Sequence, residues 1–239
     1  MGRVIMSGIV PLLKAPVTGI LAQDIAVGST VKLMEGGAAV EYLVVNQGIP
    51  SNSNLYDASC DGTWLLRKNI YSKRPWNSVR MSEYAKSDIN TWLNGTFFNS
   101  LGSVEQASIK QVKIPYSVDY HGNIASGANG LPVKVFLLSG YELGWSNVTY
   151  MPIDGAKLDY FVDGTSDEAK EKRKAYLNGV QESWWMRTIQ TQMSGDIWFT
   201  YDGNNGYGYS TETVGIRPAL LLPSNALFDK TTMLLKGVK

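Results

Sequence analysis

The stretch that decides the fold is residues 183–223, SWWMRTIQTQMSGDIWFTYDGNNGYGYSTETVGIRPALLLP. Its start, residues 184–187, is typical of a rigid aromatic strand, and its end, residues 215–222, is typical of a buried apolar strand. The interval between them is rich in Gly, Asn, Asp, Thr and Tyr. Rigid aromatic rings combined with small polar groups are the composition of adaptable binding surfaces. The pattern favours a binding surface held between two core strands, with two surface hairpins and incidental tyrosines as the alternative.

The composition of the whole chain indicates a globular protein of short strands and many turns. Hydrophobic residues make up 44% of the 239 residues and charged residues only 18%, and the 24 glycines are spread along the chain. Because no linker or repeat divides it, we expect one α+β domain of short, mostly antiparallel strands with two or three helices. The seven Trp and 13 Tyr are a heavy aromatic load, so some rings are expected on the surface.

Charge and hydropathy argue against two classes of partner. The net charge is +1, and the 22 basic residues form no stripe that could follow nucleic-acid phosphates. No run of 18 apolar residues exists, so we expect no membrane insertion. The single cysteine, Cys60, cannot form a disulfide within the chain. A folded extracellular role would therefore have to rely on core packing without a disulfide.

Three segments are distinguished along the chain. Residues 1–25 are apolar but broken by glycines and prolines, which favours an extended arm for attachment or oligomer contact. A cleaved signal peptide is the alternative, but prolines and a lysine interrupt its apolar part. We expect the domain itself over residues 26–225 and a peripheral, strand-like tail over residues 226–239.

Alternation and turn residues predict most of the strands. A hairpin is expected where Gly36 and Gly37 separate two β-rich runs, at residues 27–33 and 39–45. Further strands are expected at residues 63–68, 133–138, 184–187 and 215–222, with an extended segment at residues 112–116.

Apolar spacing and capping residues predict three helices. The first is expected to begin at the N-cap Ser87 and to end or weaken at Asn94-Gly95. A second, short helix is expected over residues 103–111, because a capping box opens it. A third is expected over residues 165–177, where an Asn-Gly pair follows its last turn.

Metal and nucleophile chemistry find little support in the sequence. One Cys and one His cannot build a structural zinc site, and residues 202–205 offer calcium ligands without the EF-hand spacing. Cys60 and His121 could pair as nucleophile and base, but a lone loop histidine and a small thiol explain them better. A pair of carboxylates for glycoside hydrolysis can come from any sequence distance. No pattern supports a particular pair, and the candidates are Glu142, Asp154, Asp159 and Asp196. We therefore predict no enzyme activity, no metal and no cofactor.

Two arginines each lie inside an apolar, strand-like run, Arg187 and Arg217. An unpaired buried charge is very costly, so each guanidinium is expected to bind loop carbonyls or a carboxylate. We expect both to fix the neighbouring loops rather than to contact a ligand. The residues predicted for this scaffold are Trp184, Trp185, Arg187 and Arg217.

Several motifs follow one another in a recognisable order, at residues 62–68, 84–94, 109–116, 134–145, 184–187 and 215–220. This order resembles a domain family of unknown function found in tailed phages and prophages of gut Firmicutes and in related bacterial proteins. The hallmark of that family is a Trp-Leu-Arg-Ser strand followed by Gly-Val-Arg-Pro-Ala-Leu. Met186 and Thr188 stand here where the family has Leu and Ser, which conserves the volume and the hydroxyl, respectively.

The resemblance implies a C-type-lectin-like fold, similar to the formylglycine-generating sulfatase-modifying domain and to phage receptor-binding proteins diversified by retroelements. In those variable proteins the diversified positions lie between the two hallmark strands, here residues 188–213. One cysteine cannot supply the formylglycine chemistry, and the calcium-dependent sugar-binding motifs of lectins are absent. The residues expected to bind a ligand are Thr188, Gln190, Gln192, Asp196, Trp198, Thr200, Tyr201, Asp202, Asn204, Asn205, Tyr207, Tyr209 and Thr211.

The function expected from this resemblance is non-enzymatic binding of a host-surface glycan or protein by a phage tail or virion surface protein. Its partners would include other virion proteins and further copies of the chain in a homo-oligomer. It would reside in the virion and, during assembly, in the bacterial cytoplasm. The alternative is a structural virion component that uses the same face and the N-terminal arm for subunit contacts. A carbohydrate-active enzyme is a third hypothesis, and it needs a carboxylate pair in one cleft.

Overall fold

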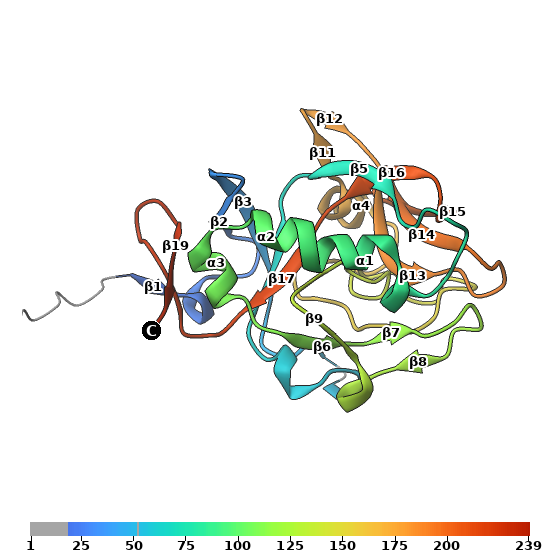
Figure 1. The fold of residues 1–239 in the computed structure, drawn as a ribbon, viewed down its shortest axis with the longest axis horizontal. Helices are drawn as coiled ribbons and strands as arrows, with labels where there is room; N and C mark the ends of the chain where they lie inside the picture. Colours follow the sequence, from blue (N-terminus) through green and yellow to red (C-terminus); the bar gives the residue numbers. More distant parts are fainter. Residues whose placement is uncertain (1–18, 52) are drawn as a thin grey trace, which may run out of the picture.

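Two five-stranded sheets form the centre of the structure, a computed structural model that describes residues 19–51 and 53–239 (Figure 1). Within these residues, the pairings between strands are antiparallel apart from one parallel pair. The helices are short and lie among the strands rather than alternating with them. The expected α+β class with mostly antiparallel strands is confirmed.

The first sheet contains, in spatial order, β10 (Val135–Phe136), β17 (Ala219–Leu222), β4 (Thr63–Arg67), β3 (Ala38–Gln47) and β2 (Thr30–Glu35). The predicted hairpin at Gly36 and Gly37 is confirmed as β2–β3, and both glycines have the positive φ that the turn requires. Trp64 on β4 is fully buried and makes edge-to-face contacts with Tyr56 and Phe136. This aromatic group forms part of the core.

The second sheet contains, in spatial order, β15 (Asn204–Tyr209), β14 (Asp196–Tyr201), β13 (Trp184–Ile189), β16 (Thr213–Ile216) and β5 (Ser72–Pro75). β13 lies at its centre, between antiparallel β14 and parallel β16. Every residue of β13 is buried, which confirms the predicted aromatic core strand. β15 is an edge strand, so one of its sides has no strand partner within the described residues.

The run predicted as one strand at residues 215–222 is two strands in different sheets. β16 pairs with β13 and β5, whereas β17 pairs with β4 and β10. Between them, Pro218 has no backbone N–H for a ladder, and its carbonyl accepts from the Arg67 N–H at 2.9 Å. The chain therefore passes from one sheet to the other at Arg217-Pro218, which ties the two sheets together.

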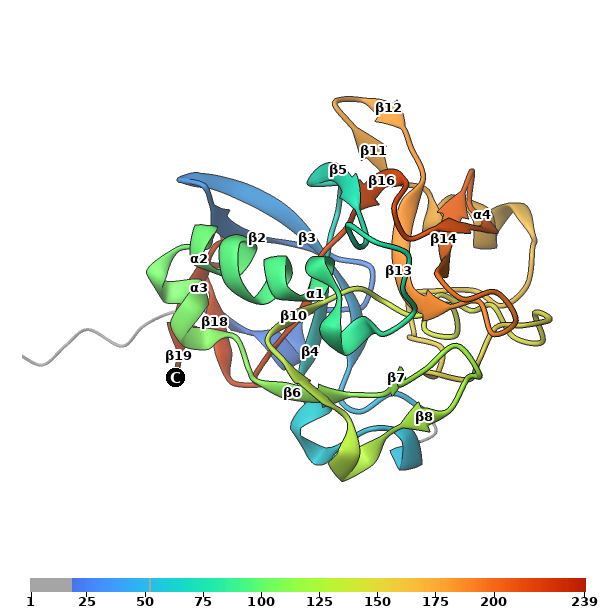
Figure 2. The same ribbon diagram turned by 45° about the vertical axis from the view of Figure 1, so that its right-hand side comes forward.

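The first helix does not end at Asn94-Gly95 but changes there to π-helical geometry. It comprises α1 (Asp88–Trp92), the π-helical η5 (Leu93–Phe97) and α2 (Phe98–Ser100). Ser87 is the N-cap, as predicted, and its Oγ accepts from the Asn90 N–H at 3.2 Å. Gly95 does not end the helix, because the buried side chains of Leu93 and Phe97 outweigh the low helix propensity of glycine. Figures 1 and 2 show this helix between the strands β2–β3 and the strands β13–β14.

The second and third helices end earlier than predicted. α3 (Ser103–Ser108) has no side-chain cap among the described residues, and α4 (Asp167–Arg173) is capped by Ser166, whose Oγ accepts from the Ala169 N–H. The rest of the predicted third helix is a hairpin of β11 (Tyr176–Leu177) and β12 (Val180–Gln181). Asn178 and Gly179 both have positive φ, which suits a two-residue hairpin turn and ends helical structure.

The core strand predicted over residues 133–138 is interrupted. β9 (Leu131–Val133) pairs with β6 (Val112–Ile114), whereas β10 belongs to the first sheet. Between β9 and β10, the N–H groups of Lys134 and Val135 donate to Asn94 Oδ1, at 2.8 and 3.1 Å. A helix side chain thus takes the place of a strand partner. Beyond β6, a small hairpin contains β7 (Tyr116–Ser117) and β8 (Ile124–Ala125).

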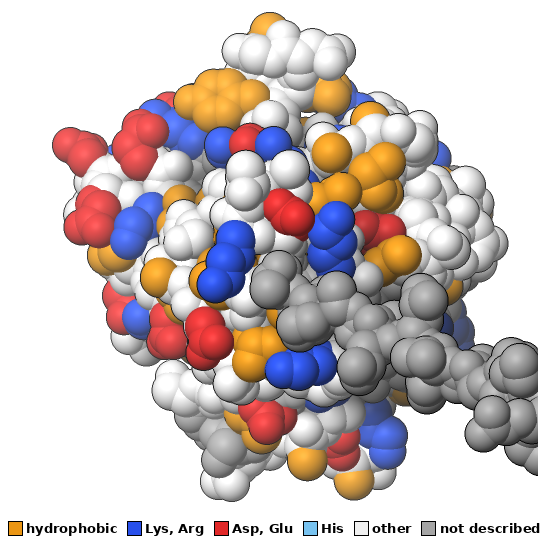
Figure 3. All heavy atoms as spheres, turned by 90° about the vertical axis from the view of Figure 1, so that its left-hand side faces the viewer, with side chains coloured by type: hydrophobic (Ala, Val, Ile, Leu, Met, Phe, Trp, Pro, Cys, Tyr) orange, Lys and Arg blue, Asp and Glu red, His pale blue; other side chains and the backbone are white. Residues whose placement is uncertain are grey.

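A three-stranded sheet contains residues near both ends of the chain, β1 (Ile20–Leu21), β18 (Ala226–Phe228) and β19 (Leu235–Val238). The predicted tail strand therefore pairs with residues 20–21, while residues 1–18 of the predicted arm lie outside the described residues. Figure 3 shows this end, where basic and acidic side chains are interspersed without a stripe of one sign.

The remaining elements are short 3₁₀ turns, η1 (Ala22–Asp24), η2 (Ser53–Leu55), η3 (Ala58–Cys60), η4 (Tyr84–Lys86) and η6 (Gly127–Asn129). In the part of the chain that the structure describes, no helix has both the length and the apolar character needed to span a membrane.

Candidate functional site

The centre of the scaffold is a buried ion pair between Arg187, on β13, and Glu142. The guanidinium donates to both carboxylate oxygens, with Nη1–Oε2 at 2.6 Å and Nη2–Oε1 at 2.7 Å. Its other N–H groups donate to the carbonyls of Pro115, Leu137 and Asp154. All five N–H groups have partners, which offsets the cost of burying the charge. Burial by itself would lower the pKa of Arg187, but the Glu142 carboxylate raises it above its usual value.

A second buried carboxyl group, that of Asp154, lies beside this pair. Thr188 Oγ1 donates to Asp154 Oδ2 at 2.9 Å and accepts from the Gly140 N–H at 2.8 Å. Burial raises the pKa of Asp154 to about 7, although Arg187 and the Thr188 hydroxyl oppose this shift. Thr188 is therefore part of the scaffold and does not reach a ligand from this position.

Replacing Asp154 with Asn is expected to remove a pH-dependent part of the stability. Burial raises the folded-state pKa to about 7, above the value of about 4 expected for the unfolded chain, so the native state holds this proton more tightly. The stabilisation is complete below about pH 4 and is lost as the pH rises to about 7, by at most about 1.4 kcal/mol per pH unit.

Urea unfolding of both proteins at about pH 5 and about pH 8 measures this effect. The free energy of unfolding of the wild type minus that of Asp154→Asn should be smaller at the higher pH. A difference that stays constant, or that grows with pH, would contradict the raised pKa.

A further buried arginine, Arg173, organises loops through backbone carbonyls alone. Its side chain donates to five of them, those of Leu143, Gly144, Val162 and Gly164 at 2.7 to 3.2 Å and that of Gly203 at 3.5 Å. Its guanidinium also lies 4.4 Å from the centre of the Trp145 ring. No local pattern indicates this role, because an arginine in the last turn of a polar helix is normally exposed.

Arg217 is as buried as Arg187 but has far fewer partners. Its Nε donates to the Arg67 carbonyl at 2.8 Å, and its guanidinium lies 5.1 Å from the centre of the Trp184 ring. Its Nη1 has no hydrogen-bond partner among the described residues. Burial lowers the pKa of Arg217 to about 10, with Tyr160 opposing the shift. The expected clamp on several loop carbonyls or a carboxylate is thus formed by Arg187 and not by Arg217.

The two tryptophans of β13 are fully buried and anchor neighbouring segments. Trp184 Nε1 donates to the Arg173 carbonyl at 2.9 Å, and Trp185 Nε1 donates to the Arg74 carbonyl at 3.1 Å. Trp185 also meets Phe199 on β14 edge to face. These contacts fix the position of the central strand β13, and the β14–β15 hairpin that pairs with it is held by the same strand.

The β14–β15 hairpin forms the edge of the second sheet next to this strand. Tyr207 is paired with Trp198 and Tyr209 with Asp196, so these four side chains lie on one face of the hairpin. Tyr201 lies three positions after Trp198 on β14 and therefore points to the opposite face. The three tyrosines are exposed to 64% (Tyr201), 48% (Tyr207) and 48% (Tyr209), but they do not share one surface.

We call the surface formed by Tyr207 and Tyr209 the tyrosine face. Arg80 lies 3.9 Å from the centre of the Tyr209 ring, and its Nη2 donates to Asp196 Oδ1 at 2.8 Å. Trp198 meets Tyr207 edge to face, with ring centres 5.1 Å apart. Both exposed rings are thus supported from behind. Arg80 is 116 residues away from Asp196 in the chain, so no local motif could have indicated its role.

The opposite face of the hairpin presents Tyr201 beside a hollow of about 450 Å³ that is lined mainly by polar residues near β12. Asp202, at the β14–β15 turn, has positive φ, and its Oδ1 accepts from Gln181 Nε2 at 2.7 Å. This hydrogen bond lowers the pKa of Asp202, and Lys174 Nζ lies 3.7 Å from the same oxygen. The carboxylate that the sequence offered to calcium is therefore already engaged by two side chains.

Burial removes five residues from the proposed set of ligand contacts, namely Thr188, Gln190, Asp196, Trp198 and Thr200. Gln190 Oε1 accepts from the N–H groups of Gln192 and Met193 and so holds the β13–β14 loop. Thr200 Oγ1 accepts from the Trp184 N–H. The residues that stay exposed or half-exposed are Gln192, Tyr201, Asp202, Asn204, Asn205, Tyr207, Tyr209 and Thr211.

The catalytic hypotheses find no assembled site among the described residues. Cys60 is buried, and burial raises the pKa of its thiol to about 12, so the reactive thiolate is scarce at neutral pH. His121 is exposed on a loop, away from this buried environment. Glu142 and Asp154 lie fully buried in the scaffold rather than in an open cleft. No group of three or more His, Cys, Asp or Glu side chains in this part of the chain could hold a metal ion.

Comparison with known families identifies one match. A family model described as "Domain of unknown function (DUF6273)" covers residues 61–224, which is more than half of the chain. The matched range begins just before β4 and ends just after β17, so it includes both the buried scaffold and the tyrosine face. No curated protein and no solved structure matches the chain.

Proposed function

The chain belongs to the DUF6273 family of domains of unknown function, and we propose that this member is a non-enzymatic binding protein whose tyrosine face recognises a host-surface glycan or protein. One observation carries this proposal: Tyr207 and Tyr209 are each 48% exposed, while Trp198 and Arg80 already support their rings. Tyr, Trp and Arg are the residues that dominate binding surfaces. Because the rings are held in place before binding, little side-chain freedom remains to be lost.

Hydrogen-bonding groups on β15, beside the tyrosine face, would orient a bound ligand. Asn205 lies two positions before Tyr207 on β15 and therefore shares its face, where its half-exposed amide can donate and accept. The outer side of β15 has no strand partner among the described residues, which leaves backbone N–H and C=O groups for a ligand. Stacking would supply most of the affinity, and these groups would supply selectivity.

The motif order in residues 62–220 supports a finer version of the proposal, a phage tail or virion surface protein with a C-type-lectin-like fold. It would meet other virion proteins and further copies of itself in a homo-oligomer. The scaffold suits a diversified surface, because Tyr207 and Tyr209 contribute little to the core that Arg187 and Arg173 hold together. Replacements on β15 can therefore change the ligand without unfolding the domain.

Binding of the labelled, purified protein to a panel of intact gut Firmicutes strains tests this function. We expect saturable binding to some strains and none to others, because a receptor-binding surface discriminates among surface polymers and proteins. Absence of binding to every strain, by a protein shown to be folded, would contradict the proposal.

A structural virion component is the second candidate, and the free edge of β15 favours it. An unpaired edge strand can add a strand from another copy and so build an assembly. The solution mass distinguishes the two candidates when it is combined with the strain panel. A stable oligomer that binds no strain and shields Tyr207 and Tyr209 from chemical modification would favour assembly over recognition.

A further inference from the structure

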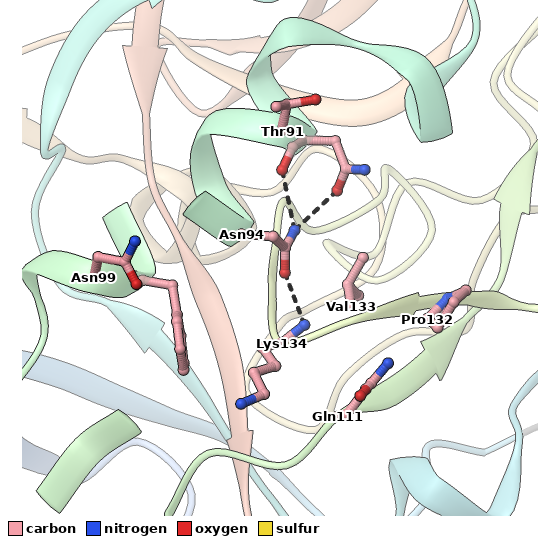
Figure 4. A pocket seen from close by; sticks show the side chains of 9 residues that line it. Thr91, Asn94, Asn99, Gln111, Pro132, Val133 and Lys134 are labelled. Atoms are coloured by element: carbon pink, nitrogen blue, oxygen red, sulfur yellow. Dashed lines mark hydrogen bonds between the residues drawn. The ribbon is translucent and has the colours of Figure 1, made fainter. Parts of the chain in front are cut away.

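A groove lined by polar and apolar side chains lies between the α1–α2 helix and the β6–β9 sheet, on elements separate from the tyrosine face (Figure 4). It has a volume of about 470 Å³. We propose that this groove is a second binding site, for a sugar that carries a carboxylate, such as a uronic acid. The inference does not rest on the function proposed for the tyrosine face.

The floor of the groove is built by Asn94, and every polar group of its side chain is used. Its Nδ2 donates to the Asn90 carbonyl, to Asn90 Oδ1 and to the Val135 carbonyl, at 2.9 to 3.1 Å. Its Oδ1 accepts from the Lys134 N–H at 2.8 Å (Figure 4). Asn94 therefore holds the helix and the strands at a fixed separation, so the groove exists before a ligand arrives. Asn94 itself is not a ligand contact.

The charge in the groove favours an anion. Lys134 is the charged residue of its lining, and no carboxylate of the described residues lines it. Lys134 Nζ lies 4.5 Å from the centre of the Phe98 ring, and no carboxylate oxygen of the described residues lies within 4.0 Å of it. A cation held over an aromatic ring without a counterion can form a charge-assisted hydrogen bond with a ligand anion.

The remaining lining favours hydroxyl groups. The side-chain amides of Asn99 and Gln111 are exposed and make no hydrogen bond with the described residues. Each amide offers both donors and acceptors, as a sugar hydroxyl also does. Pro132 and Phe98 add apolar surface on which the C–H groups of a sugar ring can lie. The combination of one ammonium, two free amides and apolar surface fits a sugar carboxylate better than a simple inorganic anion.

Titration calorimetry at low ionic strength tests the site with glucuronate, glucose and inorganic phosphate as probes. Glucuronate should bind saturably, and glucose and phosphate should each bind at least about tenfold more weakly, because each lacks one half of the recognised chemistry. Equal affinity for glucose would overturn the role of the charge. Equal affinity for phosphate would overturn the role of the hydroxyls, and the absence of saturable glucuronate binding would overturn the site.

Variants locate the binding. Lys134→Met keeps much of the apolar stem and should weaken glucuronate binding about tenfold or more, whereas Lys68→Met, which removes an exposed lysine from another part of the surface, should not change it. Gln111→Ala serves as a second variant, because this exposed amide makes no hydrogen bond with the described residues, and its loss should weaken glucuronate binding with an unchanged unfolding temperature. Wild-type affinity in both Lys134→Met and Gln111→Ala would contradict the assignment. The Tyr207→Ala/Tyr209→Ala variant should bind glucuronate like the wild type, which separates this site from the tyrosine face.

Discussion

Replacing Arg187 with Met is expected to lower the free energy of unfolding by about 3–5 kcal/mol, the effect of removing one partner from a buried ion pair. Glu142 would remain fully buried, with Tyr56 Oη as the only other side chain that donates to its carboxylate among the described residues. The carbonyls of Pro115 and Leu137 would also lose a donor. Urea unfolding followed by tryptophan fluorescence measures the loss.

Arg217→Met is the matched control, because Arg217 is equally buried and lies in the adjoining segment between β16 and β17. Its charge has no carboxylate partner and its Nη1 has no hydrogen bond among the described residues. Removing it should change the free energy of unfolding by no more than about 1 kcal/mol. Adding Glu142→Gln to Arg187→Met should recover part of the loss, because no unpaired charge would then remain buried. An Arg217→Met loss as large as that of Arg187→Met would contradict this account of the scaffold.

Replacing Tyr207 and Tyr209 together with Ala is expected to weaken cell binding by about 1,000-fold, since each central aromatic contact contributes about 2 kcal/mol and each ~1.4 kcal/mol is a factor of ten. Neither ring is buried, so the unfolding temperature should change little. The dissociation constant measured on a strain that binds the wild type reports the effect.

Tyr201→Ala is the control for this pair. Its ring is the most exposed of the three and lies on the opposite face of the same hairpin. A binding surface confined to the tyrosine face predicts that Tyr201→Ala keeps wild-type affinity. If Tyr201→Ala lost as much affinity for the cells as the Tyr207→Ala/Tyr209→Ala variant, the ligand would not be bound by the tyrosine face alone, and this prediction would be wrong.

The features that could be predicted from sequence depend on neighbouring residues. The β2–β3 hairpin follows from Gly36 and Gly37, and the N-cap at Ser87 follows from the helix that it starts. The buried strand of Trp184 and Trp185 follows from its apolar composition. In each case local propensity and tertiary packing favour the same structure, so the pattern alone is sufficient.

The features that could not be predicted depend on contacts between distant segments. Asn94 interrupts a core strand about 40 residues away, because its Oδ1 accepts from the N–H groups of Lys134 and Val135 in that strand. Arg80 supports Tyr209 from another part of the chain. Tyr201 points away from the other two tyrosines because of its position in the strand register. Composition can suggest that all three rings are exposed, but it does not say which face of the hairpin each ring occupies. These contacts decide which of the predicted ligand residues can act together.

Residue-level labelling of tyrosines in the cell-bound protein tests the central claim most directly. Iodination is carried out on the free protein and on the protein bound to a strain that it recognises, and the modified tyrosines are identified by mass spectrometry. The account predicts that cells protect Tyr207 and Tyr209, while Tyr201 remains as reactive as in the free protein. Protection of Tyr201 with Tyr207 and Tyr209 still reactive, or unchanged reactivity of all three in the bound protein, would contradict recognition through the tyrosine face.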